Sequence, residues 1–132
     1  MKAVLFDWDN TLISSWDNLY AAICHVFSHF DKVPPTMAEV KQNSHYSLRD
    51  SFPKVFGNKT EEAGKVFLDF YSQHHIANMK VIDGAEETVK MLYEKGIYMA
   101  VLSNKTGKLL REGINHLGWQ QYFSEIVGAG DA

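Results

Sequence analysis

Residues 2–12 read KAVLFDWDNTL, and this stretch decides the fold of the chain. Its first five residues are mainly apolar and too few for a helix, so they predict a buried strand of a parallel sheet. Two aspartates, Asp7 and Asp9, follow this strand directly, and a hydroxyl side chain follows at Thr11. Because ligands of open α/β sheets bind at the carboxyl ends of strands, these side chains stand where chemistry is expected.

The spacing of the two aspartates suits phosphoryl transfer. Extended backbone places alternate side chains on the same side, so Asp7 and Asp9 are expected to face the same way. One carboxylate can attack phosphorus and split a difficult displacement into two easier steps. The other can exchange protons with the leaving group and with water. Turns and caps after a strand use the same residue types, but a second motif favours the catalytic interpretation.

Residues 96–105 read GIYMAVLSNK and form this second motif. The first seven residues predict another apolar strand, which ends at Ser103, Asn104 and Lys105, and a helix is predicted from Thr106 to Leu117. A small hydroxyl between a strand and a helix N-terminus suits a phosphoryl group, because the hydroxyl, the backbone N–H groups and the helix dipole all favour an anion. Ser103 or Thr106 also fits as the N-cap of the helix, and the two roles are compatible.

Together the two motifs resemble those of the haloacid dehalogenase-like (HAD) hydrolases, in the phosphoglycolate phosphatase-like branch. The resemblance implies an α/β fold with a Rossmann-like parallel sheet of about three strands, formed by residues 1–14 and 82–132. Residues 15–81 would form an inserted α-helical cap. Such caps close over the site, exclude water and choose the substrate.

The resemblance also implies a role for each motif residue. Asp7 would be the nucleophile and Asp9 the general acid and base, while Thr11 would hold the loop and orient Asp9. Mg²⁺ would be the cofactor, bound by the Asp7 side chain and the Asp9 backbone carbonyl. Ser103 would grip the transferring phosphoryl group, with Asn104 adding a donor and Lys105 a charge.

The insert predicts helices rather than strands, because its apolar residues recur at three- and four-residue spacings. The expected helices cover residues 15–30, with Ser15 as N-cap, then residues 37–43, 47–56 and 60 to about 79. Arg49 is a candidate clamp for a second anionic group of the substrate, although such an arginine is more often a solvated surface charge. The pair His25 and His29 has no third partner at metal-ligand spacing. Residues 81–96 are expected to form a turn and a helix that stops at Gly96, and residues 123–128 are expected to form a strand.

The resemblance implies two further motifs, a lysine and a pair of acidic residues on a fourth strand, which the chain does not reach before Ala132. We therefore expect a truncated chain with little activity alone. The first strand would then be a sheet edge with unpaired backbone groups. Such an edge favours a homodimer, formed through that edge or by a swapped element.

The expected function is a Mg²⁺-dependent phosphomonoester hydrolase that acts on a small phosphorylated metabolite through a phospho-aspartyl intermediate. Two alternatives stay open: a phosphomutase of the same superfamily, and a non-catalytic binding or assembly fragment. The net charge of −3 offers no electrostatic footprint for nucleic acid or an anionic membrane. A single cysteine excludes an internal disulfide and fits the cytoplasm, and no apolar run is long enough to span a bilayer.

Overall fold

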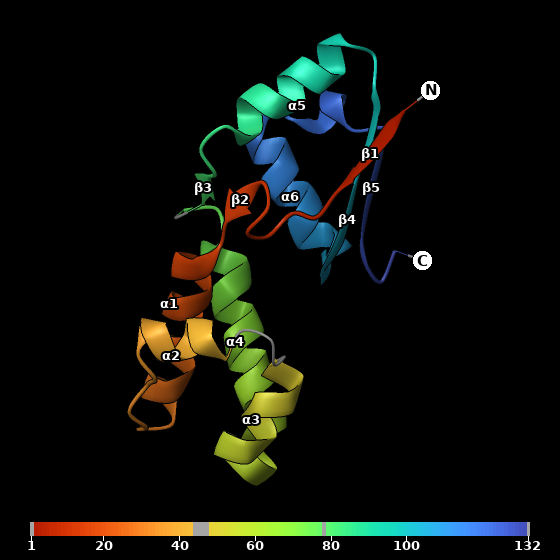
Figure 1. Cartoon of the computed structure of the whole chain (residues 1–132). Coiled ribbons are helices and arrows are strands. Elements are labelled where there is room, and N and C mark those ends of the chain that lie inside the picture. Colours follow the sequence, from red (N-terminus) through yellow and green to blue (C-terminus); the bar gives the residue numbers. More distant parts are fainter. Residues whose placement is uncertain (1, 44–47, 78, 132) are drawn as a thin grey trace. The chain divides into compact units, whose positions relative to one another are not determined.

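The computed structural model describes residues 2–43, 48–77 and 79–131. The chain divides into two compact units, which we call the sheet unit (Met1–Trp16 with His75–Ala132) and the helical unit (Asp17–His74). Figure 1 labels their elements. The sheet unit contains β1 (Ala3–Phe6), β2 (Ile13–Ser14), β3 (Lys80–Val81), α5 (Ala85–Glu94), β4 (Tyr98–Thr106), α6 (Gly107–Leu117), the 3₁₀ turn η2 (Gln120–Tyr122) and β5 (Glu125–Ala129).

The sheet is parallel, with the strand order β1-β4-β5. Phe6 lies opposite Val101 in the register of β1 with β4, and Val101 lies opposite Ile126 in β5. The predicted α/β class with a three-stranded parallel sheet is therefore confirmed. Within the described residues β1 pairs only with β4, so β1 is an edge of this sheet. A separate antiparallel pair joins β2 to β3.

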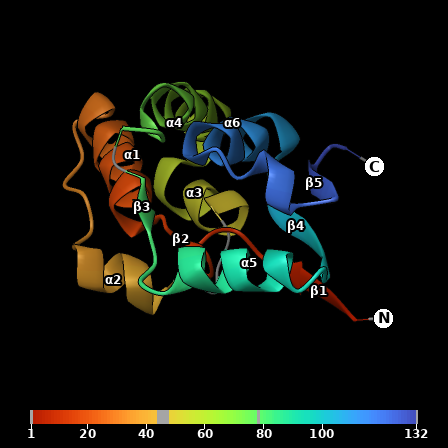
Figure 2. The same ribbon diagram turned by 90° about the horizontal axis from the view of Figure 1, so that it is seen from above.

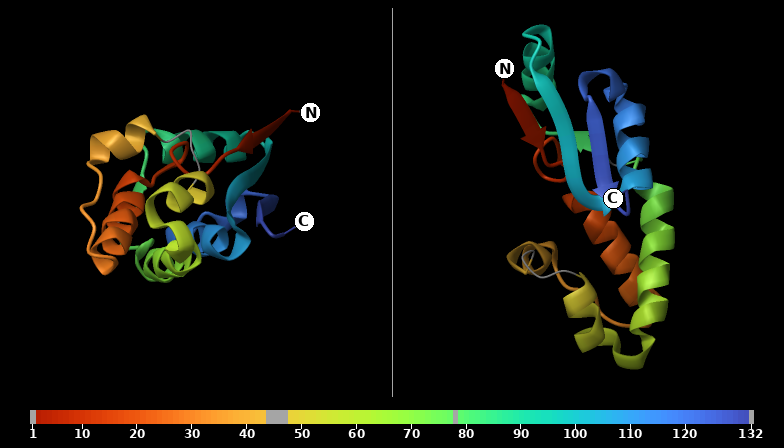
Figure 3. Two further views of the ribbon diagram at one scale, coloured as in Figure 1. Left: turned by 90° about the horizontal axis from the view of Figure 1, so that it is seen from below. Right: turned by 90° about the vertical axis from the view of Figure 1, so that its right-hand side faces the viewer.

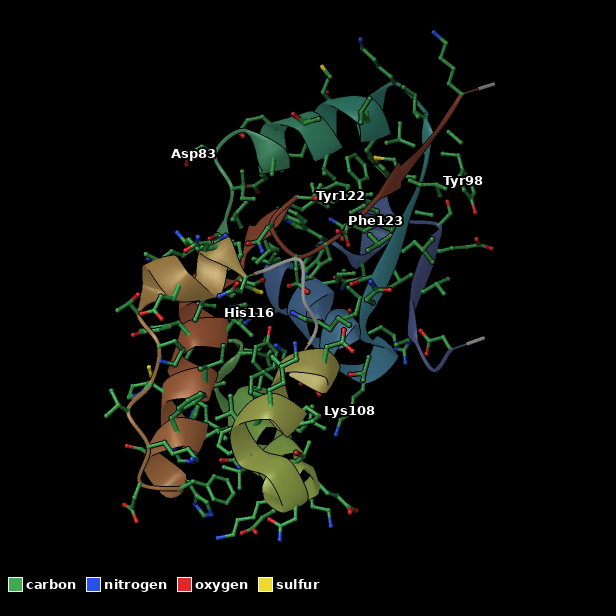
Figure 4. All side chains as sticks on the ribbon, turned by 60° about the horizontal axis from the view of Figure 1, so that its bottom comes forward. Asp83, Tyr98, Lys108, His116, Tyr122 and Phe123 are labelled. Carbon is green, nitrogen blue, oxygen red and sulfur yellow. The ribbon has the colours of Figure 1, made fainter. Side chains whose placement is uncertain are left out.

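The core of the sheet unit lies on one side of the strands. Helices α5 and α6 both pack there, as Figures 1 and 2 show. Val89, Met99, Leu110 and Ile114 are completely buried between these helices and the sheet. Figure 4 shows Phe123 on this helix-covered side and Tyr98 on the opposite side.

The other face of the sheet carries exposed apolar side chains. Leu5 is 68% exposed and Leu102 is 58% exposed, and the right-hand view in Figure 3 looks onto these strands. Because parallel sheets of α/β proteins are normally covered on both faces, this exposed face is unusual for the fold.

Two predicted boundaries in the sheet unit differ from the structure. Strand β4 runs through the predicted tip to Thr106, because Thr106 still pairs with Ala129 of β5 after a register irregularity that begins at Leu102. Helix α6 therefore begins at Gly107, one residue later than predicted. Strand β5 begins at Glu125 rather than at residue 123, since Phe123 is buried in the core directly after η2.

The helical unit contains α1 (Trp16–His29), α2 (Met37–Gln42), α3 (Leu48–Phe56), the 3₁₀ turn η1 (Gly57–Lys59) and α4 (Thr60–His74). Its core gathers Val26, Phe52, Phe56 and Ala63. The helices predicted in this part of the chain are present, whereas residues 80–81, which the prediction included in the helical insert, form strand β3 of the sheet unit. The prediction that the last helix continues to about residue 79 is wrong: α4 ends at His74, because the next residue, His75, is buried in the sheet unit.

His75 is only 3% exposed, and its Nε2 lies 3.2 Å from the Glu112 carboxylate of α6.

No helix within the described ranges is both long and apolar enough to cross a membrane.

Candidate active site

The loop after β1 is built around Trp8. The carbonyl oxygen of Trp8 accepts hydrogen bonds from the backbone N–H groups of residues 11–13, which folds the loop back on itself. Its indole is 1% exposed and meets Trp119 edge to face, with ring centroids 6.1 Å apart. Because neighbouring side chains of extended backbone point to opposite sides, burying Trp8 turns Asp7 and Asp9 away from the core.

Asp7 is exposed at the carboxyl end of β1. The register of Phe6 opposite Val101 places Asp7 level with Leu102, which directly precedes Ser103 of the second motif. One carboxylate oxygen, Oδ1, accepts the N–H of Trp8 at 2.8 Å. The other oxygen, Oδ2, accepts no hydrogen bond from the described residues, so it is available to a ligand.

Asp9 is held more firmly than Asp7. Its Oδ1 accepts a hydrogen bond from Nζ of Lys105 at 2.8 Å and another from Oγ of Ser15 at 2.5 Å. The Lys105 side chain is 10% exposed and that of Asp9 is 31% exposed. Solvent and salt therefore screen this ion pair less than a pair on the open surface.

Asn10 closes the loop beside Asp9. It adopts a left-handed backbone conformation, with φ +60°, which asparagine tolerates better than most residues. Its side-chain oxygen accepts the backbone N–H of Ser15 at 3.1 Å. Ser15 therefore binds Asp9 through its hydroxyl and Asn10 through its backbone. Thr11 is exposed, and its side chain makes no hydrogen bond with the part of the chain that the structure describes.

The second motif meets the loop through Lys105. Ser103 and Lys105 are half-buried, whereas Asn104 between them is exposed. The Ser103 hydroxyl accepts the backbone N–H of Lys105 at 3.1 Å. The structure thus brings Asp9, Lys105 and Ser15 together, with Ser103 beside Lys105, and it leaves Asn104 facing solvent.

The backbone behind Lys105 is packed closely. A Cβ atom added to Gly128 would lie 2.6 Å from the carbonyl oxygen of Lys105 and 2.6 Å from the backbone of Gly107. The Asp131 carboxylate accepts the N–H of Gly128 at 2.8 Å and both terminal nitrogens of Arg111, at 2.8 and 3.3 Å. The Arg111 hydrogen bonds first, and the Gly128 N–H second, hold the pKa of Asp131 below its usual value.

The donor set fits a partial Mg²⁺ site. Mg²⁺ is usually bound by one or two carboxylates together with waters and substrate phosphates. The free Oδ2 of Asp7 and the backbone carbonyl of Asp9 can supply two such oxygens, while Oδ1 of Asp9 is occupied by Lys105 and Ser15. Among the described residues no three His, Cys, Asp or Glu side chains form a closed metal cluster.

The remaining candidates from the sequence lie in the helical unit. Arg49 belongs to α3, but its side chain lies outside what the structure describes. His25 stacks on Phe70, with ring centroids 4.4 Å apart, and His29 lies 3.7 Å from Glu62. The sequence-based analysis missed Ser15 as a site residue. A serine at the start of a helix has the local signature of an N-cap, so only the folded loop reveals its contact with Asp9.

Comparisons with known proteins identify relatives of this chain. The chain is 26% identical over 131 residues to the pyrophosphatase PpaX of Halalkalibacterium halodurans, which covers 99% of this chain and 61% of that protein. It is 26% identical over 137 residues to phosphoglycolate phosphatase 1 of Pseudomonas aeruginosa, which covers 96% of this chain and 50% of that protein. The chain thus spans between half and about three fifths of the length of these relatives.

A solved hydrolase of the haloacid dehalogenase-like family from Streptococcus pneumoniae superposes with a TM-score of 0.90 at 17% identity, over 99% of this chain and 62% of that one. At this identity the likeness shows the fold alone. The family model described as haloacid dehalogenase-like hydrolase matches residues 4–132, which is nearly the whole chain. The chain therefore belongs to the haloacid dehalogenase-like hydrolase family.

Proposed function

We propose that this protein is a phosphomonoester hydrolase that acts on a small phosphorylated metabolite through a phospho-aspartyl intermediate. The observation that carries the proposal is the 2.8 Å ion pair between Asp9 and Lys105. This ion pair joins the two motifs at the carboxyl ends of β1 and β4. The printed names of two relatives, a pyrophosphatase and a phosphoglycolate phosphatase, support a phosphate-bearing substrate.

In the first step Asp9 is protonated at Oδ2. Oδ2 of Asp7 attacks phosphorus, and the bond from phosphorus to the leaving oxygen breaks as Asp9 delivers this proton to that oxygen. In the second step water attacks phosphorus, the bond between phosphorus and Oδ2 of Asp7 breaks, and Oδ2 of Asp9 takes the proton of that water. Inorganic phosphate leaves, and both carboxyl groups return to their starting states.

The other residues of the site would stabilise the negative charge on the oxygens of the transferring phosphoryl group. The Ser103 hydroxyl and the backbone at the start of α6 provide donors for its oxygens. Mg²⁺, held by the Asp7 carboxylate and the Asp9 carbonyl, would neutralise part of the charge that gathers on those oxygens. Asp7 is exposed, so a substrate reaches it without displacing a side chain of the sheet unit.

The test is hydrolysis of p-nitrophenyl phosphate by the 132-residue chain, with and without Mg²⁺. We expect weak turnover from the wild-type chain and none from Asp7→Asn, which should still fold because the substitution preserves shape and removes only the nucleophile. Asp83→Asn is a matched control: Asp83 is an exposed aspartate in the turn before α5 (Figure 4), apart from the site.

Mg²⁺-dependent turnover that survives in Asp7→Asn would refute the assignment of the nucleophile. Absence of turnover from the folded wild-type chain would show that these residues do not suffice for catalysis. It would favour a non-catalytic role for the chain.

A further inference from the structure

Two donors converge on one oxygen of Asp9. Ser15 and Lys105 both bind Oδ1, at 2.5 and 2.8 Å, whereas Oδ2 accepts no hydrogen bond from the described residues. The carboxylate is therefore asymmetric: one oxygen is fixed and the other is open. A carboxyl group that shuttles protons needs a defined orientation and one free oxygen, and this arrangement provides both.

The two donors come from separately anchored parts of the sheet unit. Ser15 is 7% exposed and is tied through its backbone N–H to Asn10. Lys105 stands 96 residues away from Asp9 in the sequence, on β4, and its backbone N–H binds the Ser103 hydroxyl. Because each donor is fixed by its own contact, rotation of the Asp9 side chain would break two hydrogen bonds, and both are charge-assisted when the carboxylate is ionised.

Thr11 does not share this role. Its side chain is exposed and makes no hydrogen bond with the described residues, so it does not fix the orientation of the Asp9 carboxylate. The orienting role that the motif resemblance implies for Thr11 therefore has a better structural basis in Ser15 and Lys105.

We propose that Ser15 and Lys105 are the positioning residues of Asp9. They fix Oδ1 and leave Oδ2 to exchange the proton with the leaving group and with water. The catalytic meaning of this arrangement rests on the proposed phosphohydrolase function, whereas the geometry can be tested without turnover.

The experiment follows the side-chain carboxyl carbon of Asp9 by ¹³C NMR in labelled 132-residue protein, with Asp9→Asn to identify the signal. Ser15→Ala removes a single oxygen atom. Lys105→Met removes the positive charge and keeps a side chain of similar length. The matched control is Lys90→Met, which removes an ion pair of similar length, 3.0 Å to Glu86, on α5.

We expect the Asp9 signal to move in Ser15→Ala and in Lys105→Met, and to stay in place in Lys90→Met and in Thr11→Val. We also expect kcat to fall by about 10- to 100-fold in Ser15→Ala with KM nearly unchanged, a part of the ~10²–10⁴-fold that acid–base catalysis contributes. If Ser15 only supported folding, Ser15→Ala would lower the melting temperature without lowering kcat selectively over KM.

An Asp9 signal that is unchanged in Ser15→Ala, or that moves only in Thr11→Val, would overturn the proposal. Unchanged kcat in an active wild-type background would overturn it as well. If the signal moves as expected but the wild-type chain has no turnover, the positioning geometry stands and the proposed function fails.

Discussion

Replacing Gly128 by alanine should destabilise the sheet unit by forcing β5 away from the start of α6. The new Cβ atom would lie 2.6 Å from three backbone atoms, whereas ordinary contact begins at 3.4 Å, so the neighbouring backbone must retreat by roughly 0.8 Å. Overpacking of this kind costs about 1–3 kcal/mol. We expect the upper half of that range, because backbone cannot rotate aside as a side chain can. The melting temperature should fall by roughly 6–15 °C, since ~1 kcal/mol corresponds to about 3–5 °C for a chain of this length.

The matched control is Gly64→Ala, in the second turn of α4. A Cβ atom there meets nothing within 4 Å, and alanine favours a helix interior over glycine by about 0.5–1 kcal/mol. The two substitutions are chemically identical and should therefore change stability in opposite directions. Urea titration followed by circular dichroism measures both. Equal stability of Gly128→Ala and the wild type would refute the close approach of β5 and α6.

Asp131→Asn should reduce stability at neutral pH and make little difference in acid. Arg111 and the Gly128 N–H hold the pKa of Asp131 below its ordinary value. The stability that the ionised carboxylate contributes is therefore complete above the unfolded pKa of about 3.9, and it is lost as the pH falls through the lower folded value. Thermal melts of both proteins should converge at low pH, and a constant gap would contradict this linkage. Ile114→Ala, at a completely buried position, should cost about 2–5 kcal/mol in a urea titration, whereas Leu5→Ala, at an exposed position, should cost less than about 0.5 kcal/mol.

The elements that could be predicted from the sequence are those with local signals. The strand before Asp7 is an apolar run bounded by polar residues, and Gly118 marks the end of α6 with a positive φ of 71°. The helical insert follows from apolar spacing alone. In each case the residues that decide the structure lie within one or two turns of each other.

The elements that could not be predicted depend on distant partners. Helix α4 ends at His74 because His75 lies beside Glu112, which is 37 residues away. The polar residues 103–106 have the composition of a loop, yet Thr106 continues the strand because it pairs with Ala129 of β5. Neither pairing leaves a signal in the local sequence.

The same distinction separates the two halves of the candidate site. Asp7 and Asp9 could be located from their spacing because they occupy one short loop, whereas the contact between Asp9 and Lys105 exists only after β1 pairs with β4. The extension of β4 matters here, because burial alternates along it and Lys105 is turned inward while Asn104 faces solvent. Two glycines make that extension compatible with an immediate helix start. A Cβ atom on Gly128 would collide with the Lys105 carbonyl and the Gly107 backbone, and one on Gly107 would collide with the Asp131 carboxylate. The placement of Asp9 therefore depends on two glycines that make no contact with it.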